Sequence, residues 1–203
     1  MKLYYSPGAC SLVPHILLRE TALPHTLIKV DTGKHVTEQG VDYRGINPKG
    51  YVPVLELEDG VRLTEGPVIA QFIADRARRE DLMPAAGSMA RYRVMEWQNY
   101  ITSELHKSFS PLFNRALDAA AKEVFLAILH KKFAWVSEQL AAQPYLTGTG
   151  FTAADAYLFT VAGWAKLVGL ELAGLAPLQA FLQRVAARDA VRQALVAEGL
   201  AQA

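Results

Sequence analysis

Residues 2–11 read KLYYSPGACS, and this stretch decides the fold of the first part of the chain. Its first five residues are mostly apolar or aromatic, which predicts a strand over residues 2–6. A proline and a glycine then interrupt the pattern. In residues 11–23 apolar side chains recur at helical spacing, so we expect a helix that begins directly after Cys10.

Cys10 is the one cysteine among the 203 residues, and it lies at the predicted start of this helix. The first turn of a helix has unpaired backbone N–H groups and the positive end of the helix dipole. A thiol placed there ionises more readily, and the thiolate is the reactive form. We therefore interpret Cys10 as a reactive residue, with a small buried core residue as the alternative. Because an internal disulfide is excluded, a reducing compartment is expected.

The patterns along the chain predict an α/β part followed by an all-α part. Further strands are expected at residues 26–31, 52–57 and 61–64, and a helix at 67–78. From about residue 90 apolar residues recur at steps of three and four, which predicts helices over residues 90–117, 123–142, 153–170, 178–187 and 191–199. We expect one domain over residues 1–80, a linker over 81–88 and an all-helical bundle domain over 89–203.

The order of the first elements, βαβ and then ββα with a cysteine before the first helix, resembles thioredoxin. A dithiol enzyme of that fold would have a second cysteine where this chain has Val13. Any disulfide of Cys10 must therefore join another molecule, and a small thiol such as glutathione is the obvious partner. The thioredoxin-like fold also implies a cis bond before Pro53, which leaves the backbone of Val52 free to pair with an extended ligand. The sequence alone leaves a trans proline open.

Two short motifs stand at predicted helix starts. Gly66 lets a ligand approach the backbone where free N–H groups suit a carboxylate, and Glu65 can hold an ammonium group. Together they suit the zwitterionic end of an amino acid, although ordinary helix capping gives the same pattern. Thr152 and Asp155 have the spacing of a capping box, which we interpret as a folding element and not as a site.

In the helical part, four polar side chains are spaced to share one helix face: Asn99, Ser103, His106 and Lys107. His106 could pair with the thiolate or donate to a leaving group. The alternative interpretation is a solvated face. The other histidines have no ligand spacing with one another or with Cys10, so we predict no metal site.

The composition argues against several classes of partner. The net charge is +1 and no segment gathers Lys and Arg on one face, so no nucleic-acid partner is expected. The most apolar stretch, between Asp155 and Lys166, is too short for a membrane span, which needs about 20 residues. Because the first residues lack the apolar run of a signal peptide, we predict a cytoplasmic protein without a membrane partner.

Four motifs carry a close resemblance to a known family. They are KLYYSPGACSL at residues 2–12, NPKGYVPVL at 47–55, LTEG at 63–66 and FTAADAYLF at 151–159. With them the chain looks like a cytosolic glutathione S-transferase of the bacterial beta class. The resemblance implies a thioredoxin-like domain, an all-helical domain with the electrophile pocket and the dimer interface, and assembly as a homodimer.

The resemblance also implies which residues act. Cys10 would contact the glutathione sulfur and could form a mixed disulfide with it. Val52 would bind the tripeptide backbone, and Glu65 and Gly66 would hold its γ-glutamyl end. The helical domain would contribute, partly across the dimer interface, Asn99, Ser103, Glu104, Leu105 and His106.

One position departs from the family pattern. The family usually has a lysine, which binds the glycine carboxylate of glutathione, where this chain has His35. A lysine is charged near neutral pH, whereas a histidine of ordinary pKa, about 6.5, is mostly neutral at about pH 7.5. We therefore predict that the adjacent Lys34 supplies most of the charge that holds this carboxylate.

These observations predict a detoxifying transferase that adds glutathione to small apolar electrophiles. Two alternatives remain open. One is a glutathione-dependent disulfide reductase or peroxidase that works through a mixed disulfide at Cys10. The other is a non-enzymatic protein that binds apolar compounds.

Overall fold

Residues 1–202 are described by the structure, a computed structural model. They divide into two compact units. The first unit contains Met1–Met83 and the segment that starts at Ala187, and the second unit contains Pro84–Ala186. The two units are described in turn.

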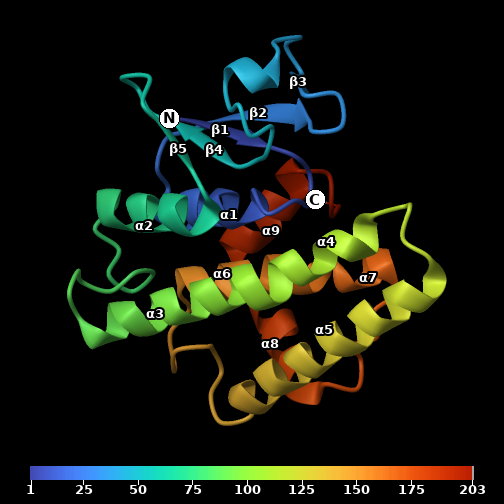
Figure 1. Ribbon diagram of the computed structural model, residues 1–203. Coiled ribbons are helices and arrows are strands. Elements are labelled where there is room, and N and C mark those ends of the chain that lie inside the picture. The colour runs from blue at the N-terminus through green and yellow to red at the C-terminus, as the bar shows by residue number, and fades with distance from the viewer. Residues whose placement is uncertain (203) are drawn as a thin grey trace. The chain divides into compact units, whose positions relative to one another are not determined.

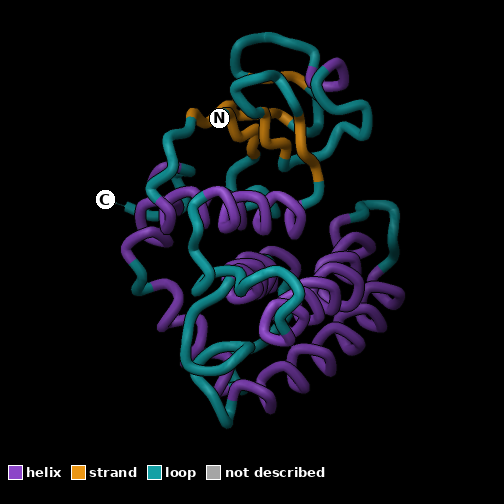
Figure 2. Tube along the Cα trace, turned by 90° about the vertical axis from the view of Figure 1, so that its left-hand side faces the viewer, coloured by secondary structure: helices purple, strands orange, loops and turns teal. Residues whose placement is uncertain are grey.

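The first unit is built on a five-stranded mixed sheet in the order β3-β2-β1-β4-β5. Its strands, orange in Figure 2, are β1 (Lys2–Tyr5), β2 (Thr26–Asp31), β3 (Val36–Thr37), β4 (Val54–Glu56) and β5 (Arg62–Thr64). β1 and β2 are parallel, and the other neighbours are antiparallel. The strands expected from the sequence are confirmed. The short β3 and a 3-10 turn at Tyr43–Gly45 were not predicted, and they lie in the irregular stretch between β2 and β4.

Helices α1 (Leu12–Thr21) and α2 (Gly66–Arg76) pack side by side on one face of this sheet (Figure 1). α2 buries one side, at Ile69, Ala70, Ile73 and Ala74, whereas α1 is buried all round over residues 12–18. Tyr4, Ile28 and Val54 stand in register on one face of the sheet. They form a core cluster with Val30, Tyr43 and Val52. Tyr43 and Val52 come from the segment between β3 and β4, so the cluster holds this segment against the sheet.

The last helix, α9 (Asp189–Ala197), packs against α1 and belongs to the first unit. This differs from the helical domain that the sequence predicts over residues 89–203. Just beyond α9, the buried carboxylate of Glu198 accepts a hydrogen bond from the N–H of Gly8 and lies 2.8 Å from Nδ1 of His15. These partners are 190 and 183 positions away from Glu198, so no local sequence pattern could reveal the contact.

The second unit is a helical bundle, as predicted. Its helices are α3 (Met89–Tyr100), α4 (Lys107–Phe113), α5 (Ala119–Leu140), α6 (Ala153–Gly163), α7 (Ala165–Val168) and α8 (Ala176–Ala186). Phe109, Phe133 and Phe181 are fully buried in it, and burial of such a side chain contributes roughly 1.5–3 kcal/mol. Across residues 1–202, no helix combines the length and the apolar character that a bilayer crossing requires.

A π-helical segment, Ile101–His106, joins α3 to α4 and interrupts the helix predicted over residues 90–117. Its backbone bonds span five residues instead of four, so the phase of the side chains changes there. The hydroxyls of Thr102, Ser103 and Ser108 donate to carbonyl oxygens four residues earlier, at 2.7, 3.1 and 2.7 Å. Such side-chain bonds to the backbone bend helices. The helical path ends at Phe113, because the next residue is extended.

The predicted capping box at the start of α6 is present. One carboxylate oxygen of Asp155 accepts from the backbone N–H and the hydroxyl of Thr152, both at 2.8 Å. The other oxygen accepts from the N–H of Leu146, also at 2.8 Å. Burial raises the pKa of Asp155 to about 6, and these hydrogen bonds act in the opposite direction. Asp155 is therefore a folding element, as the sequence predicts.

Candidate functional site

Cys10 lies in the turn between β1 and α1. The helix begins at Leu12, and the N–H groups of Leu12 and Val13 donate to the carbonyl oxygens of Ala9 and Cys10. The cysteine thus precedes the helix by one residue more than the sequence predicts. Its thiol donates a hydrogen bond to the carbonyl oxygen of Val52, with Sγ and O 3.2 Å apart.

The thiol of Cys10 is harder to ionise than the sequence suggests. Burial raises its pKa to about 11, and the negative charge of Glu65 acts in the same direction. The backbone N–H groups of Cys10 and Ser11 lower the pKa, as expected near a helix start. The expectation of a readily ionised thiol is wrong for this state of the protein, because the cost of burying a thiolate exceeds the gain from the two N–H groups. At neutral pH Cys10 is a thiol that can donate a hydrogen bond.

The loop before Val52 is fixed by hydrogen bonds to one backbone carbonyl. The hydroxyl of Tyr43 and the side-chain amide of Asn47 both donate to the carbonyl oxygen of Tyr51, at 2.9 and 2.7 Å. The peptide bond between Val52 and Pro53 is cis, as the resemblance implies. The carbonyl of Val52 accepts from Cys10, while its N–H has no hydrogen-bond partner within residues 1–202. The N–H of Val52 is thus left for pairing with a ligand, although the residue as a whole is buried.

Glu65 has a left-handed backbone conformation, with φ of 70°, directly before α2. A residue with a side chain in this region carries a cost on the order of 1–3 kcal/mol, and such residues cluster at functional sites. Its carboxylate lies 2.5 Å from the ammonium of Lys49, which also donates to the hydroxyl of Thr64 at 2.9 Å. Glu65 therefore does hold an ammonium group here, that of Lys49. Sequence reasoning gave Lys49 no role, although it stands in the motif NPKGYVPVL.

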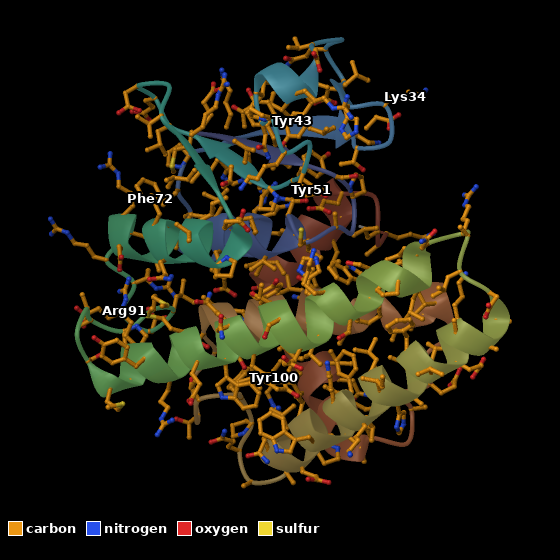
Figure 3. The ribbon with its side chains drawn as sticks, in the orientation of Figure 1. Lys34, Tyr43, Tyr51, Phe72, Arg91 and Tyr100 are labelled. Atoms are coloured by element: carbon orange, nitrogen blue, oxygen red, sulfur yellow. The ribbon has the colours of Figure 1, made fainter. Side chains whose placement is uncertain are left out.

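His35 and Lys34 lie in different surroundings. The ring of His35 packs on Gly50, where a Cβ atom would come within 2.9 Å of Nδ1. This nitrogen is buried and has no partner within the described part of the chain. The Lys34 side chain is 81% exposed, with Nζ 3.8 Å from a carboxylate oxygen of Asp31. Figure 3 shows it at the outer edge of the loop after β2, directed away from Tyr51. The structure thus sets His35, and not Lys34, against the loop that leads to Val52.

The second unit carries the other candidate residues, on and beside the π-helical segment. The carbonyl of Asn99 accepts from the hydroxyl of Ser103. Glu104 pairs with Lys132 at 2.9 Å, which lowers the pKa of the carboxylate. Leu105 is fully buried in the core, so its side chain cannot reach a ligand.

His106 is partly buried, whereas the other three residues of the predicted polar face, Asn99, Ser103 and Lys107, are exposed to solvent. Its Nδ1 lies 2.7 Å from the hydroxyl oxygen of Tyr157. Its ring meets that of Trp164 edge to face, with centroids 4.7 Å apart. Trp164 also contacts the rings of Phe109 and Phe113. Sequence reasoning missed these aromatic partners, although Tyr157 stands in the motif FTAADAYLF.

Comparisons with known proteins assign both parts of the chain to one family. Residues 8–76 match the glutathione S-transferase N-terminal domain, and residues 114–193 match the glutathione S-transferase C-terminal domain. Glutathione S-transferase GstA of Escherichia coli O157:H7 is 49% identical over 200 residues, which cover 98% of this chain and 100% of that protein.

Solved structures agree with this assignment. BphK, a bacterial glutathione S-transferase solved as a ternary complex, matches with a TM-score of 0.96 at 51% identity over 98% of this chain and 100% of that chain. The cysteine turn on a mixed sheet and the helical unit therefore define a glutathione transferase enzyme, and the chain belongs to the glutathione S-transferase family. The bacterial beta class glutathione S-transferase of Sphingomonas chungbukensis matches with a TM-score of 0.95 at 39% identity, over 99% of this chain and 100% of that chain. The predicted resemblance to the beta class is confirmed.

Proposed function

We propose that this protein conjugates glutathione to small apolar electrophiles, with Cys10 at the glutathione sulfur. The observation that carries the proposal is the hydrogen bond from the Cys10 thiol to the carbonyl of Val52. It brings the reactive side chain to a backbone segment that can pair with an extended peptide. A ligand whose own sulfur lies at Cys10 and whose backbone pairs with Val52 is a thiol peptide of the size of glutathione.

The γ-glutamyl end would bind at the start of α2. Its ammonium group suits Glu65, and its carboxylate suits the backbone N–H of Gly66 at the start of α2. Lys49 now occupies the carboxylate of Glu65, so ligand binding exchanges one ammonium group for another. The pair is largely exposed, and exposed ion pairs contribute little, about 0–1 kcal/mol. The exchange therefore costs little.

Cys10 would act as a hydrogen-bond donor to the bound glutathione thiolate. Because burial keeps Cys10 protonated, its S–H can turn from the Val52 carbonyl to the glutathione sulfur, while that carbonyl accepts from the peptide. The glutathione thiolate then attacks the electrophilic carbon, a C–S bond forms, and the leaving group departs with its electron pair. The thiol proton of glutathione passes to solvent on ionisation. Nothing in this step oxidises or reduces Cys10.

The aromatic side chains around His106 support an apolar, aromatic electrophile. Phe113 is 50% exposed and packs on Trp164, so its ring can stack with another ring. His106 would donate a hydrogen bond to the leaving group or to the sulfur. Asn99, Ser103 and Glu104 would add polar contacts to glutathione, in a homodimer in which part of these contacts come from the partner subunit.

The alternative of a disulfide reductase rests on the same cysteine. That reaction needs the Cys10 thiolate as nucleophile, which the raised pKa makes scarce at neutral pH. We therefore place conjugation first, with mixed-disulfide formation as a slower side reaction.

Conjugation of glutathione to a chlorinated aromatic compound and reduction of a glutathione mixed disulfide, assayed side by side, test the proposal. We expect measurable conjugation that saturates with glutathione. Reduction without conjugation would establish the reductase, and binding of apolar compounds with neither activity would establish the non-enzymatic alternative. Light scattering at working concentration tests the homodimer.

A further inference from the structure

The contact between His106 and Tyr157 is short and partly buried. The hydroxyl oxygen of Tyr157 lies 2.7 Å from Nδ1 of His106, and the two rings meet edge to face at 88°. Tyr157 is 4% exposed and comes from α6, whose capping box fixes the start of the helix. Trp164 packs on another side of the imidazole at a centroid distance of 4.7 Å. The ring of His106 is therefore held in orientation by two aromatic residues of the same unit.

The hydrogen bond also bears on which ring nitrogen carries the proton. A neutral imidazole has one N–H donor and one acceptor nitrogen, and the partner of one nitrogen determines the role of the other. A phenol is a good donor, and the unprotonated imidazole nitrogen is a better acceptor than a phenol oxygen. The short O···N distance fits a bond that runs from the hydroxyl to Nδ1.

We propose that Tyr157 is a positioning residue, which donates its hydroxyl proton to Nδ1 of His106 and so keeps the proton of the neutral imidazole on Nε2. In this tautomer His106 donates from Nε2 without needing a positive charge. The part of this inference that concerns catalysis rests on the proposed function, in which His106 donates to the leaving group or the sulfur. The tautomer itself does not depend on it.

The tautomer is tested by NMR on the free protein with 15N-labelled histidine. Long-range 1H–15N correlation spectra at about pH 8 distinguish an imidazole protonated on Nε2 from one protonated on Nδ1, and His106→Gln assigns the signal. We expect the Nε2–H pattern in the unmodified protein and a mixture of tautomers in Tyr157→Phe. The control is Tyr145→Phe, which removes a hydroxyl from a tyrosine of the same unit whose ring meets those of Phe151 and Phe181 edge to face. It should leave the signal unchanged.

An Nδ1–H pattern in the unmodified protein, or an unchanged tautomer in Tyr157→Phe, overturns the proposal. A melting temperature of Tyr157→Phe close to that of Tyr145→Phe shows that any change in tautomer is not a result of unfolding. If Tyr157→Phe melts below the assay temperature, the tautomer is read in the unmodified protein alone, where the Nδ1–H pattern still overturns the proposal.

Kinetics separate this inference from the proposed function. We expect Tyr157→Phe to lower kcat by about threefold to tenfold, the range of one neutral hydrogen bond, with KM for glutathione unchanged. In a His106→Gln background the same substitution should have no further effect, because the two residues act as a pair. A change in tautomer with kcat unchanged keeps the tautomer assignment and overturns the catalytic role of His106. A fall in kcat that persists in the His106→Gln background shows that Tyr157 acts directly and overturns its role as a positioning residue.

Discussion

The thiol of Cys10 donates a hydrogen bond to the carbonyl oxygen of Val52 across 3.2 Å. The two residues are 42 positions apart, and they come from the turn before α1 and the loop before β4. Through this bond the partly buried cysteine is held as a protonated donor. Its chemistry is therefore set by the loop opposite it as much as by its place near a helix start.

Replacement of Cys10 should separate the two candidate activities. Cys10→Ala is expected to lower disulfide reduction by at least about a hundredfold, because that reaction needs the cysteine sulfur as nucleophile. It should lower conjugation by no more than about tenfold, the loss of one hydrogen bond to the thiolate. Cys10→Ser, which keeps a donor, should recover most of the conjugation. Equal and nearly complete loss of both activities in Cys10→Ala would show that this division is wrong.

The pH dependence of thiol modification should report the raised pKa of Cys10. Iodoacetamide reacts with the thiolate. As long as the pH is below the pKa, the thiolate fraction increases about tenfold with each unit of rising pH. With the pKa at about 11, the rate of alkylation should still rise by about a hundredfold between pH 7 and pH 9. Intact-mass spectrometry follows it, since the chain has one cysteine. A free thiol peptide, whose pKa is about 8.5, serves as the control and should begin to level off over the same range. A rate that is already constant at pH 7 would contradict the raised pKa.

Oxidised glutathione should modify the same residue. We expect an adduct of one glutathionyl group per chain, formed slowly at pH 7 and faster at pH 9, because Cys10 must first lose its proton. Cys10→Ala should take up none. The mass of the protein after incubation, with and without a reductant, measures the adduct and its reversal. No adduct at pH 9, in protein that iodoacetamide still alkylates, would count against a glutathione site at Cys10.

Glutathione affinity should depend on His35 more than on Lys34. The sequence favours Lys34, but Lys34 is exposed beside Asp31, whereas His35 packs on the loop that leads to Val52. A hydrogen bond to a charged group contributes roughly 1.5–3 kcal/mol before solvent screening. We therefore expect His35→Ala to weaken glutathione binding by up to about tenfold, since about 1.4 kcal/mol corresponds to one decade.

Calorimetric titration of the two alanine variants with glutathione distinguishes these residues. Lys34→Ala should change affinity by less than about twofold, whereas His35→Ala should lower it. Loss of affinity in Lys34→Ala, with His35→Ala unchanged, would restore the assignment that the sequence favours.

The stability of the first unit should depend on Glu198. This carboxylate is buried and contacts the N–H of Gly8 and the ring of His15. Removing a partner of a buried charged hydrogen bond costs about 1.5–3 kcal/mol for each bond, because the remaining polar group is left unsatisfied. We expect Glu198→Ala to lower the free energy of unfolding by about 3 kcal/mol, measured by urea denaturation with fluorescence detection. Glu171→Ala, at an exposed glutamate, should change it by less than about 0.5 kcal/mol. Equal effects of the two substitutions would show that the contact contributes nothing.

Much of the fold follows from local patterns in the sequence. The stretch KLYYSPGACS predicts β1 and the start of α1, because strand and helix periods and a Pro-Gly break are properties of neighbouring residues. The capping box of Thr152 and Asp155 was predicted for the same reason. The motifs also determined the family, since a few short stretches carry its resemblance. Local spacing did not predict the π-helical segment at Ile101–His106, where side-chain hydroxyls compete for backbone carbonyls.

The tertiary structure alone decided the state of the candidate site. Whether Cys10 ionises depends on the burial that distant residues impose on it. Which of His35 and Lys34 packs on Gly50 depends on the path of the loop, and the hydrogen-bond partner of His106 is a tyrosine 51 positions away. The physical reason is common to all three. Charge, protonation and hydrogen bonding respond to whatever lies within a few ångströms, and chain folding, not sequence order, determines those neighbours.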